Sequence, residues 1–199
     1  MRPLLIGLVG GTASGKTTIS RLLVQRLGDG CSYISHDAYY KSLPASYRTR
    51  PEDYNFDHPD ALESSRLVED LKRLCDGHSV DVPSYDFATH LRRPREQWLT
   101  VASRPVILVE GILILAVPEL RALLDGSVFV QAAQEVRLAR RLTRDVQERG
   151  REEMDVRAQF ASTVAPMHDR YVEPYAGAAG LLVDGEGDVE DSLKAVEAY

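Results

Sequence analysis

The chain contains only two cysteines, Cys31 and Cys75, among its 199 residues. Two cysteines are too few for the disulfide framework of a small secreted domain, so we expect a reducing compartment. The chain also lacks a long apolar run. The longest, residues 106–117, is interrupted by Glu110 and is too short to cross a bilayer. Together with the absence of a signal-peptide pattern, these features predict a cytoplasmic protein without a membrane segment.

Lysine is also scarce in this sequence. There are four lysines against twenty arginines, and the formal net charge is −6 at pH 7. A negative net charge argues against a broad nucleic-acid-binding surface. The arginines are suited to smaller anions, because a guanidinium group binds two phosphate oxygens at once.

At this length we expect a single domain, residues 1–199, with a full hydrophobic core. Short apolar segments alternate with amphipathic helical patterns, which predicts an α/β fold in three layers around a five-stranded parallel sheet. The expected strands are residues 4–9, 31–35, 105–109, 128–130 and 181–183.

A glycine-rich segment joins the first expected strand to a helix. It matches G-x-x-x-x-G-K-[ST] through Gly10, Gly15, Lys16 and Thr17. In such a loop backbone N–H groups turn towards a phosphate chain, the lysine reaches the β- and γ-phosphates, and the threonine suits Mg²⁺. We therefore predict binding of a nucleoside triphosphate with Mg²⁺. The residues expected to bind the nucleotide are Gly10, Gly11, Thr12, Ala13, Ser14, Gly15, Lys16, Thr17 and Thr18.

Two acidic residues follow expected strands. Asp37 comes after strand 31–35, and Glu110 comes after strand 105–109. Ligands of open α/β sheets collect at the carboxyl ends of the strands. Asp37 can accept a proton from an attacking hydroxyl, bind Mg²⁺ through water, or simply cap a loop. Glu110 fits a metal-directed carboxylate, since a glutamate in an apolar run is costly unless it is paired.

The middle of the chain carries aromatic and polar residues in loops. Residues 54–59 combine an aromatic ring, a carboxylate and an imidazole, which suits a small polar ligand or an ordinary surface turn. Asp60 and Glu63 then form a capping-box pattern for a helix that ends at Gly77. Residues 80–82 and 98–101 alternate like a two-stranded ribbon, so we expect an inserted hairpin over about residues 79–102. This insertion is either a lid over a planar ligand or an apolar satellite cluster.

A helix rich in arginine follows the fourth expected strand. Its helical period separates the apolar residues Leu138, Ala139, Leu142 and Val146 from the basic residues Arg137, Arg140, Arg141 and Arg144. Arg149-Gly150-Arg151 follows and resembles a hinge, so residues 144–155 form an expected lid region. The arginines are either a solvated face or a phosphate-binding group. The helix containing Val156 and Phe160 is expected to bend or break at Pro166.

These segments together resemble the uridine kinase (uridine–cytidine kinase) family of P-loop kinases, from about residue 5 to about residue 174. The most specific pieces, in the family's order, are Asn55-Phe56-Asp57-His58-Pro59-Asp60-Ala61, Tyr85-Asp86-Phe87 with His90, Glu110-Gly111-Ile112-Leu113, and Arg141-x-x-Arg144-Asp145-x-x-x-Arg149-Gly150-Arg151. The resemblance implies transfer of the γ-phosphoryl group of ATP or GTP to the 5′-hydroxyl of uridine or cytidine. It also implies the sheet order 2-3-1-4-5 and a homo-oligomer, commonly a tetramer.

The resemblance also assigns roles to particular residues. Asp37 would be the catalytic base, assisted by Lys16, Arg144 and Arg149, while Thr17, Asp37 and Glu110 would hold Mg²⁺. The substrate-binding residues would be Phe56, Asp57, Tyr85, Phe87, His90, Arg141, Arg151 and Gln159. Asp57 and Arg141 would contact the ribose hydroxyls, and Tyr85 and His90 the pyrimidine.

The sequence departs from this family after the last strand. The family's Pro, basic residue and Gly are replaced by Asp184-Gly185-Glu186-Gly187-Asp188, which leaves the preference between ATP and GTP open. Asp188 would fill the family's acidic position near the nucleotide. The alternatives are a phosphoribulokinase- or pantothenate kinase-like enzyme and a non-catalytic nucleotide-binding subunit, which would leave Asp37 and Asp57 without a role. A regulatory GTPase needs an Asn-Lys-x-Asp stretch, whereas the only asparagine here, Asn55, precedes Phe56.

Overall fold

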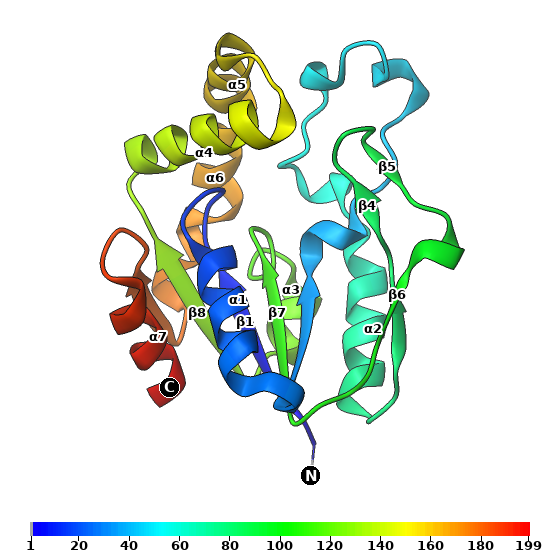
Figure 1. Ribbon diagram of the computed structural model, residues 1–199, viewed down its shortest axis with the longest axis vertical. Helices are drawn as coiled ribbons and strands as arrows, with labels where there is room; N and C mark the ends of the chain where they lie inside the picture. Colours follow the sequence, from blue (N-terminus) through cyan, green and yellow to red (C-terminus); the bar gives the residue numbers. More distant parts are fainter. Residues whose placement is uncertain (1) are drawn as a thin grey trace.

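The structure is a computed structural model that describes residues 2–199. A five-stranded parallel sheet forms its centre (Figure 1). The strands are β1 (Leu4–Val9), β2 (Cys31–Ser35), β7 (Val106–Gly111), β8 (Gly126–Gln131) and β9 (Leu181–Asp184). Their order is β2-β7-β1-β8-β9. Counted within this sheet alone, that order is 2-3-1-4-5, as the resemblance implies. The labels are not consecutive because four short strands lie outside the sheet.

Helices cover both faces of the sheet (Figure 1). Helices α1 (Lys16–Leu27) and α7 (Val189–Ala198) lie on one side, and α2 (Ser64–Cys75) and α3 (Pro118–Leu123) on the other. Helices α4 (Gln134–Arg149) and α5 (Glu153–Gln159) lie beyond one end of the sheet, and α6 (Ala165–Tyr171) follows them in the chain (Figure 1). Ile19 and Leu23 of α1 and Leu193 of α7 pack with one face of the sheet. Leu71 of α2 and Leu120 of α3 pack with the other. The predicted three-layer α/β class is therefore confirmed.

The register of the strands brings their carboxyl ends to one level. Leu8 of β1 pairs with Glu110 of β7, which also pairs with Ser35 of β2. The segments that follow these strands therefore begin side by side, although they are far apart in the chain. This edge of the sheet is where the sequence places the phosphate loop, Asp37 and Glu110.

The insertion after α2 contains two small antiparallel ribbons. Strand β3 (Val80–Val82) pairs with β6 (Leu99–Val101), and β4 (Tyr85–Asp86) pairs with β5 (Leu91–Arg92). The outer pair is the ribbon expected from the alternating pattern. The inner pair was not expected, because two residues on each side are too few to show a period of two.

The expected capping box at Asp60 and Glu63 is wrong. Asp60 lies in a short 3-10 turn, η5 (Pro59–Ala61), and its N–H donates to His58 Nδ1 at 3.2 Å. Helix α2 begins only at Ser64, and the Glu63 side chain makes no capping hydrogen bond. Instead, the Glu63 carboxylate pairs with Arg92 of β5. Glu63 thus forms a long-range ion pair in place of a local cap. No local sequence pattern could reveal this pair, because its two residues lie far apart in the chain.

The helix near Pro166 changes geometry without ending. A π-helical segment, η7 (Phe160–Val164), joins α5 to α6, and Pro166 lies in the first turn of α6. Proline lacks the N–H that would bond to the preceding turn, so the helix widens there. The remaining short helices are η1 (Gly28–Gly30), η2 (His36–Tyr39), η3 (Ala45–Tyr47), η4 (Pro51–Asp53), η6 (Arg95–Gln97) and η8 (Glu173–Ala178).

Both cysteines, Cys31 and Cys75, are free thiols, which agrees with the absence of a disulfide framework. Among residues 2–199, none of the helices has the length and apolar character that crossing a membrane requires.

Candidate active site

The phosphate loop lies between β1 and the first turn of α1. Gly10 and Gly15 have φ values of 150° and 106°, which side-chain-bearing residues rarely adopt. A Cβ on Gly10 would come within 2.4 Å of the Val130 carbonyl oxygen, so the loop packs closely against β8. Ser14 is fully buried, and its Oγ has no hydrogen-bond partner among the described residues. A backbone cradle with an unpartnered hydroxyl fits a phosphate chain.

Lys16 is the first residue of α1, and its side chain folds over the loop. It is 8% exposed, and its Nζ donates to the Gly11 carbonyl at 3.3 Å. A backbone carbonyl is a weaker partner for an ammonium group than a phosphate oxygen. The lysine is thus held at the loop by a contact that a phosphate can replace.

Thr17 and Glu110 meet next to the phosphate loop. Thr17 Oγ1 donates to Glu110 Oε1 at 2.6 Å, and the Tyr33 hydroxyl donates to Glu110 Oε2 at 2.5 Å. Glu110 is 4% exposed, so these hydroxyls supply the hydrogen bonds that a buried carboxylate needs. Tyr33 was missed at the sequence level, because its partner lies in another strand and nothing in the local pattern joins the two.

Asp37 lies just beyond β2, in η2. Burial raises the pKa of Asp37 above its ordinary value, and the charge of Lys16 opposes that rise. Glu110 raises the pKa further, whereas Arg149 and Arg144 lower it. Asp37 follows Ser35, the residue of β2 that pairs with Glu110 of β7, so it lies at the same edge of the sheet as that carboxylate.

The residues expected to hold Mg²⁺, which are Thr17, Asp37 and Glu110, offer one hydroxyl and two carboxylates. No group of three or more His, Cys, Asp or Glu side chains within residues 2–199 forms an all-protein metal cage. Mg²⁺ commonly binds through one or two carboxylates and substrate phosphates, and it keeps several waters. Two carboxylates and one hydroxyl beside a phosphate cradle fit that pattern.

The aromatic residues of the insertion and of loop 54–59 form one cluster around Tyr40. The Tyr40 ring lies 6.1 Å from that of Phe56, 5.3 Å from that of Tyr85 and 6.4 Å from that of Phe87, between centroids. His90 stacks on Phe56 at 4.8 Å with an interplanar angle of 27°. Four of the expected substrate-binding residues thus lie together, and Tyr40 at their centre was not predicted.

Polar groups in this region lack partners of their own. The buried Tyr85 hydroxyl has no hydrogen-bond partner among the described residues, and burial raises the pKa of Tyr85 to about 12. Asp57 is 8% exposed; burial raises the pKa of Asp57, and Arg141 opposes that rise. A buried hydroxyl and a buried carboxylate beside aromatic rings can recognise a small ligand with both polar and planar parts.

Helix α4 buries three of its charged residues. Arg137, Arg141 and Asp145, one turn apart, are its buried residues, whereas Val146 is 40% exposed and Ala139 is exposed. The interpretation of the basic face as solvated is therefore wrong for Arg137 and Arg141. Leu138 and Leu142 of the apolar face are only half-buried, because this helix closes a polar site instead of covering the core.

Four arginines surround the Asp145 carboxylate, and we call them the arginine cluster. The cluster consists of Arg141, Arg144, Arg149 and Arg151. Gln159 joins two of its members, since its Oε1 accepts from Arg141 at 3.0 Å and from Arg151 at 2.7 Å. Arg141 also donates to Thr12 Oγ1 of the phosphate loop at 3.3 Å. Asp145 has a place in the sequence motif but was given no role there.

The segment after β9 lies against the phosphate loop. Arg140 Nη1 donates to the carbonyls of Gly185 at 2.8 Å and Ser14 at 3.4 Å, which links this segment, α4 and the loop. The Asp188 carboxylate caps α7 by accepting from the N–H of Glu190 at 2.7 Å. In this structure Asp188 therefore has a local structural partner.

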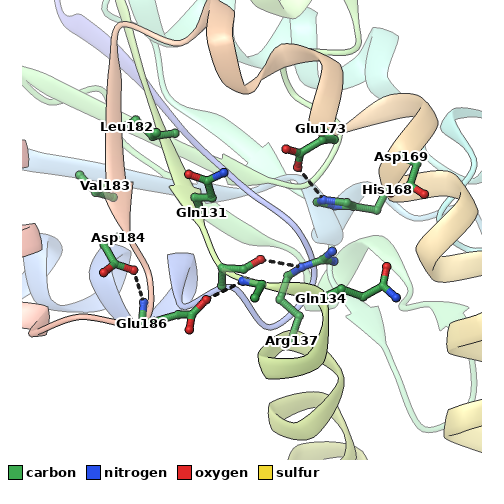
Figure 2. Close-up of a pocket in the computed structure, with 12 residues that line it drawn as sticks. Gln131, Gln134, Arg137, His168, Asp169, Glu173, Leu182, Val183, Asp184 and Glu186 are labelled. Atoms are coloured by element: carbon green, nitrogen blue, oxygen red, sulfur yellow. Dashed lines mark hydrogen bonds and ion pairs between the residues drawn. The ribbon is translucent and has the colours of Figure 1, made fainter.

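A cavity of about 690 Å³ lies beside these residues and contains none of the predicted site residues. Figure 2 shows that it is bounded by the end of β8, the start of α4, α6 and β9. His168 lines this cavity and bonds to Glu173 at 3.0 Å. It also lines a small cavity with Thr12 and Asp57. The arrangement at the phosphate loop, and not this larger hollow, carries the groups needed for phosphoryl transfer.

Known proteins resemble this chain over most of its length. Residues 5–190 match the model of the Phosphoribulokinase / Uridine kinase family. A uridine kinase of Chloroflexus aurantiacus is 45% identical over 186 residues, covering 93% of this chain and 88% of that protein. A uridine kinase of Clostridium botulinum is 40% identical over 190 residues, covering 94% and 90%.

Solved structures share the fold at lower identity. A possible uridine kinase from Bacillus stearothermophilus has a TM-score of 0.68 at 21% identity, covering 92% of this chain and 90% of that one. A D-glycerate 3-kinase from Cryptococcus neoformans has a TM-score of 0.64 at 15% identity, covering 94% and 88%. With the family model and the curated relatives in agreement, this chain belongs to the phosphoribulokinase/uridine kinase family.

Proposed function

We propose that this protein phosphorylates uridine and cytidine at the 5′-hydroxyl, with ATP or GTP as donor, giving UMP and CMP. The position of Asp37 is the observation that carries the proposal. Asp37 lies in η2, directly after β2, and its pKa responds to the charges of Lys16, Glu110, Arg149 and Arg144. A base at this point can take the proton of a hydroxyl that attacks a phosphoryl group held by the loop and the arginines.

The phosphoryl donor would lie in the cradle of residues 10–18. Lys16 would exchange its contact with the Gly11 carbonyl for the donor's β- and γ-phosphates. Arg144 and Arg149 would stabilise the charge that spreads over the migrating phosphoryl group. Thr17, Asp37 and Glu110 would hold Mg²⁺, which when bound neutralises charge on the phosphate oxygens.

The acceptor would lie between the aromatic cluster and α4. Asp57 and Arg141 would bind the ribose 2′- and 3′-hydroxyls, and the charge of Arg141 already acts to lower the pKa of Asp57. Tyr85 and His90 would contact the pyrimidine, with Phe56 and Phe87 as its walls. Arg151 and Gln159, hydrogen-bonded at 2.7 Å, would complete the substrate side. Two polar groups support this assignment. The buried Tyr85 hydroxyl has no hydrogen-bond partner among the described residues, and the Asp57 carboxylate is 8% exposed.

Phosphorylation of another small alcohol is the main alternative, because the family also includes phosphoribulokinases. A sugar phosphate or an aliphatic acid would not need a cluster of four aromatic rings around the acceptor. The relatives at 40–46% identity are named uridine kinases, which favours a nucleoside.

The deciding experiment offers purified protein with Mg²⁺ and either ATP or GTP a panel of acceptors. The panel contains uridine, cytidine, adenosine, ribulose 5-phosphate and pantothenate, and products are separated by chromatography. We expect UMP and CMP from the pyrimidine nucleosides and no product from the others. Turnover of ribulose 5-phosphate or pantothenate without turnover of uridine would replace this proposal. The two donors are compared directly, since Asp188 caps α7 and the usual basic residue is missing.

Two further expectations accompany this function. Pyrimidine salvage would take place in the cytoplasm on free nucleosides, with no nucleic-acid or membrane partner. The resemblance also implies a homo-oligomer, commonly a tetramer. Light scattering of the purified protein measures its mass directly, and a monomer would exclude the oligomer.

A further inference from the structure

The Asp145 carboxylate is completely buried and faces the arginine cluster from both of its oxygens. Oδ1 lies 2.9 Å from Arg144 Nη2 and 3.5 Å from Arg149 Nη1. Oδ2 lies 3.4 Å from Arg141 Nε and 3.5 Å from Arg151 Nη1. One side chain therefore touches every member of the cluster.

Positively charged groups outnumber the carboxylate at Asp145. A buried carboxylate is stable only when it is paired, and here four guanidinium groups surround one carboxylate. The charge of Asp57 also acts to raise the pKa of Arg141, and that of Asp37 acts to raise the pKa of Arg149, so four guanidinium groups meet three carboxylates in all. One positive charge remains unbalanced, which leaves the cluster able to accept a further anion. Burial lowers the pKa of Arg149, and the charge of neighbouring Arg144 lowers it further, as expected for crowded cations.

The cluster reaches both halves of the candidate active site. Arg141 and Arg151 share Gln159, and Arg141 also contacts Thr12 of the phosphate loop. Arg149 lies over Phe87 of the insertion at 5.2 Å. Through these contacts the position of Asp145 is connected to the acceptor side and to the phosphate side at once.

We propose that Asp145 is a positioning residue that holds the arginine cluster in its phosphoryl-transfer geometry before the triphosphate arrives. This rests on the proposed kinase function. Asp145 occupies guanidinium N–H groups that a phosphate would otherwise attract, so it competes with the triphosphate for the same donors. Asp145 thereby weakens binding of the triphosphate in the ground state. It also keeps the arginines directed at the migrating phosphoryl group, where their interaction with the transition state raises kcat.

The test compares Asp145→Asn with the wild type in two measurements. The first is kcat for uridine with saturating MgATP, which should fall between about tenfold and a hundredfold, the usual effect of misplaced catalytic groups. The second is the Kd of a non-hydrolysable ATP analogue, AMP-PNP with Mg²⁺, by titration calorimetry. We expect Asp145→Asn to bind AMP-PNP several-fold more tightly than the wild type, although it turns over more slowly.

Opposite changes in rate and affinity separate positioning from mere structural support. A purely structural role predicts weaker AMP-PNP binding together with lower kcat, and that result would overturn the proposal. So would a kcat within threefold of wild type. The matched control is Asp29→Asn, an exposed acidic residue of η1 at the far end of α1, which should change neither quantity.

A second variant covers the case in which Asp145→Asn does not fold. Asp145→Glu keeps the charge and moves the carboxylate, so AMP-PNP affinity should stay near wild type while kcat falls. Wild-type kcat in Asp145→Glu would contradict the proposal. If wild-type protein phosphorylates no nucleoside, the kinase function fails, and the AMP-PNP titration still tests the relation between Asp145 and the triphosphate.

Discussion

The guanidinium carbon of Arg149 lies 5.2 Å from the centre of the Phe87 ring, so the end of α4 touches the inserted ribbon. Arg149 also lies 3.5 Å from Asp145 Oδ1. The contact joins the expected lid region to the expected acceptor wall. Replacing Arg149 and Phe87 one at a time therefore distinguishes the effect of the positive charge from the effect of the aromatic ring.

Replacing the arginines should affect the rate more than substrate binding. In Arg149→Ala or Arg144→Ala, the fold decrease in kcat should exceed the fold increase in the KM for uridine. The reason is that the negative charge facing these arginines grows in the transition state. Phe87→Leu should instead raise that KM by about twofold to fivefold, the equivalent of one exposed cation–π contact. Steady-state kinetics measure both. Leu99→Ala, an exposed position on β6, is the control. Wild-type kcat in both arginine variants would make the cluster structural.

Replacing the Asp37 carboxylate should lower the rate of phosphoryl transfer. Asp37→Asn should lower kcat by about a hundredfold to ten-thousandfold, the range for a positioned base, and leave uridine binding largely intact. Near-normal turnover would remove Asp37 from the mechanism.

The pH dependence of Asp37 follows from the direction of its shift. Its folded-state pKa is raised, so the native state holds the proton at a pH where the unfolded chain has lost it. This group therefore lowers stability as pH rises from its ordinary pKa through the raised value. At neutral pH Asp37→Asn should have a higher Tm than the wild type, as thermal melts can measure. In the wild type, kcat should decline as pH falls through the raised pKa.

Asp57 should make the enzyme selective for ribonucleosides. A carboxylate that faces the ribose hydroxyls loses hydrogen bonds when the 2′-hydroxyl is absent, and a buried acceptor left unpaired costs about 1–3 kcal/mol. Deoxyuridine should therefore have a kcat/KM at least about tenfold below that of uridine. The Asp57→Asn variant should lose most of this discrimination. Equal use of the two substrates by the wild type would refute the assignment.

His90 should serve uracil and cytosine alike. Burial lowers the pKa of His90, and the charges of Arg151 and Arg149 lower it further. The imidazole therefore stays neutral at pH values somewhat below its ordinary pKa. A neutral imidazole has one donor and one acceptor nitrogen and can match either base. Uridine and cytidine should differ by less than about tenfold in kcat/KM.

His90→Phe separates recognition from structural support. The imidazole stacks on Phe56, and its backbone has φ of 56°, so the residue also shapes the ribbon. If His90 reads the base, His90→Phe should lose kcat/KM on both pyrimidines without gaining activity on adenosine. A drop in Tm with unchanged kcat/KM for the folded protein would show that it only supports the ribbon.

Tyr33 should tune the metal-directed carboxylate. Its hydroxyl holds Glu110 Oε2, which leaves Oε1 to Thr17. Tyr33→Phe should weaken divalent-cation binding by roughly tenfold, as loss of a hydrogen bond behind a metal ligand commonly does. Mn²⁺ titration by electron paramagnetic resonance in the presence of AMP-PNP measures this without turnover. Tyr47→Phe, on a more exposed ring, should leave the affinity unchanged.

The sequence by itself determined the elements whose signals are local. The phosphate loop is contiguous, and the φ values of Gly10 and Gly15 are the ones that its glycines permit. The five strands followed from apolar runs, and their carboxyl ends brought Asp37 and Glu110 near the loop, because parallel strands end at one edge of a sheet. The outer ribbon followed from alternation. The identities of the site residues came from motif resemblance, not from any local rule.

Only the tertiary structure decided which side chains meet. A helical period shows that α4 has two faces but not which one is covered, and here Arg137, Arg141 and Asp145 point inward. Glu63 left its expected cap for Arg92, and Tyr33 found Glu110 in a neighbouring strand. Such choices depend on burial and charge supplied by distant segments, and a buried carboxylate takes whichever partners the fold brings to it. Asp145 at the centre of the arginine cluster is therefore a property of the fold.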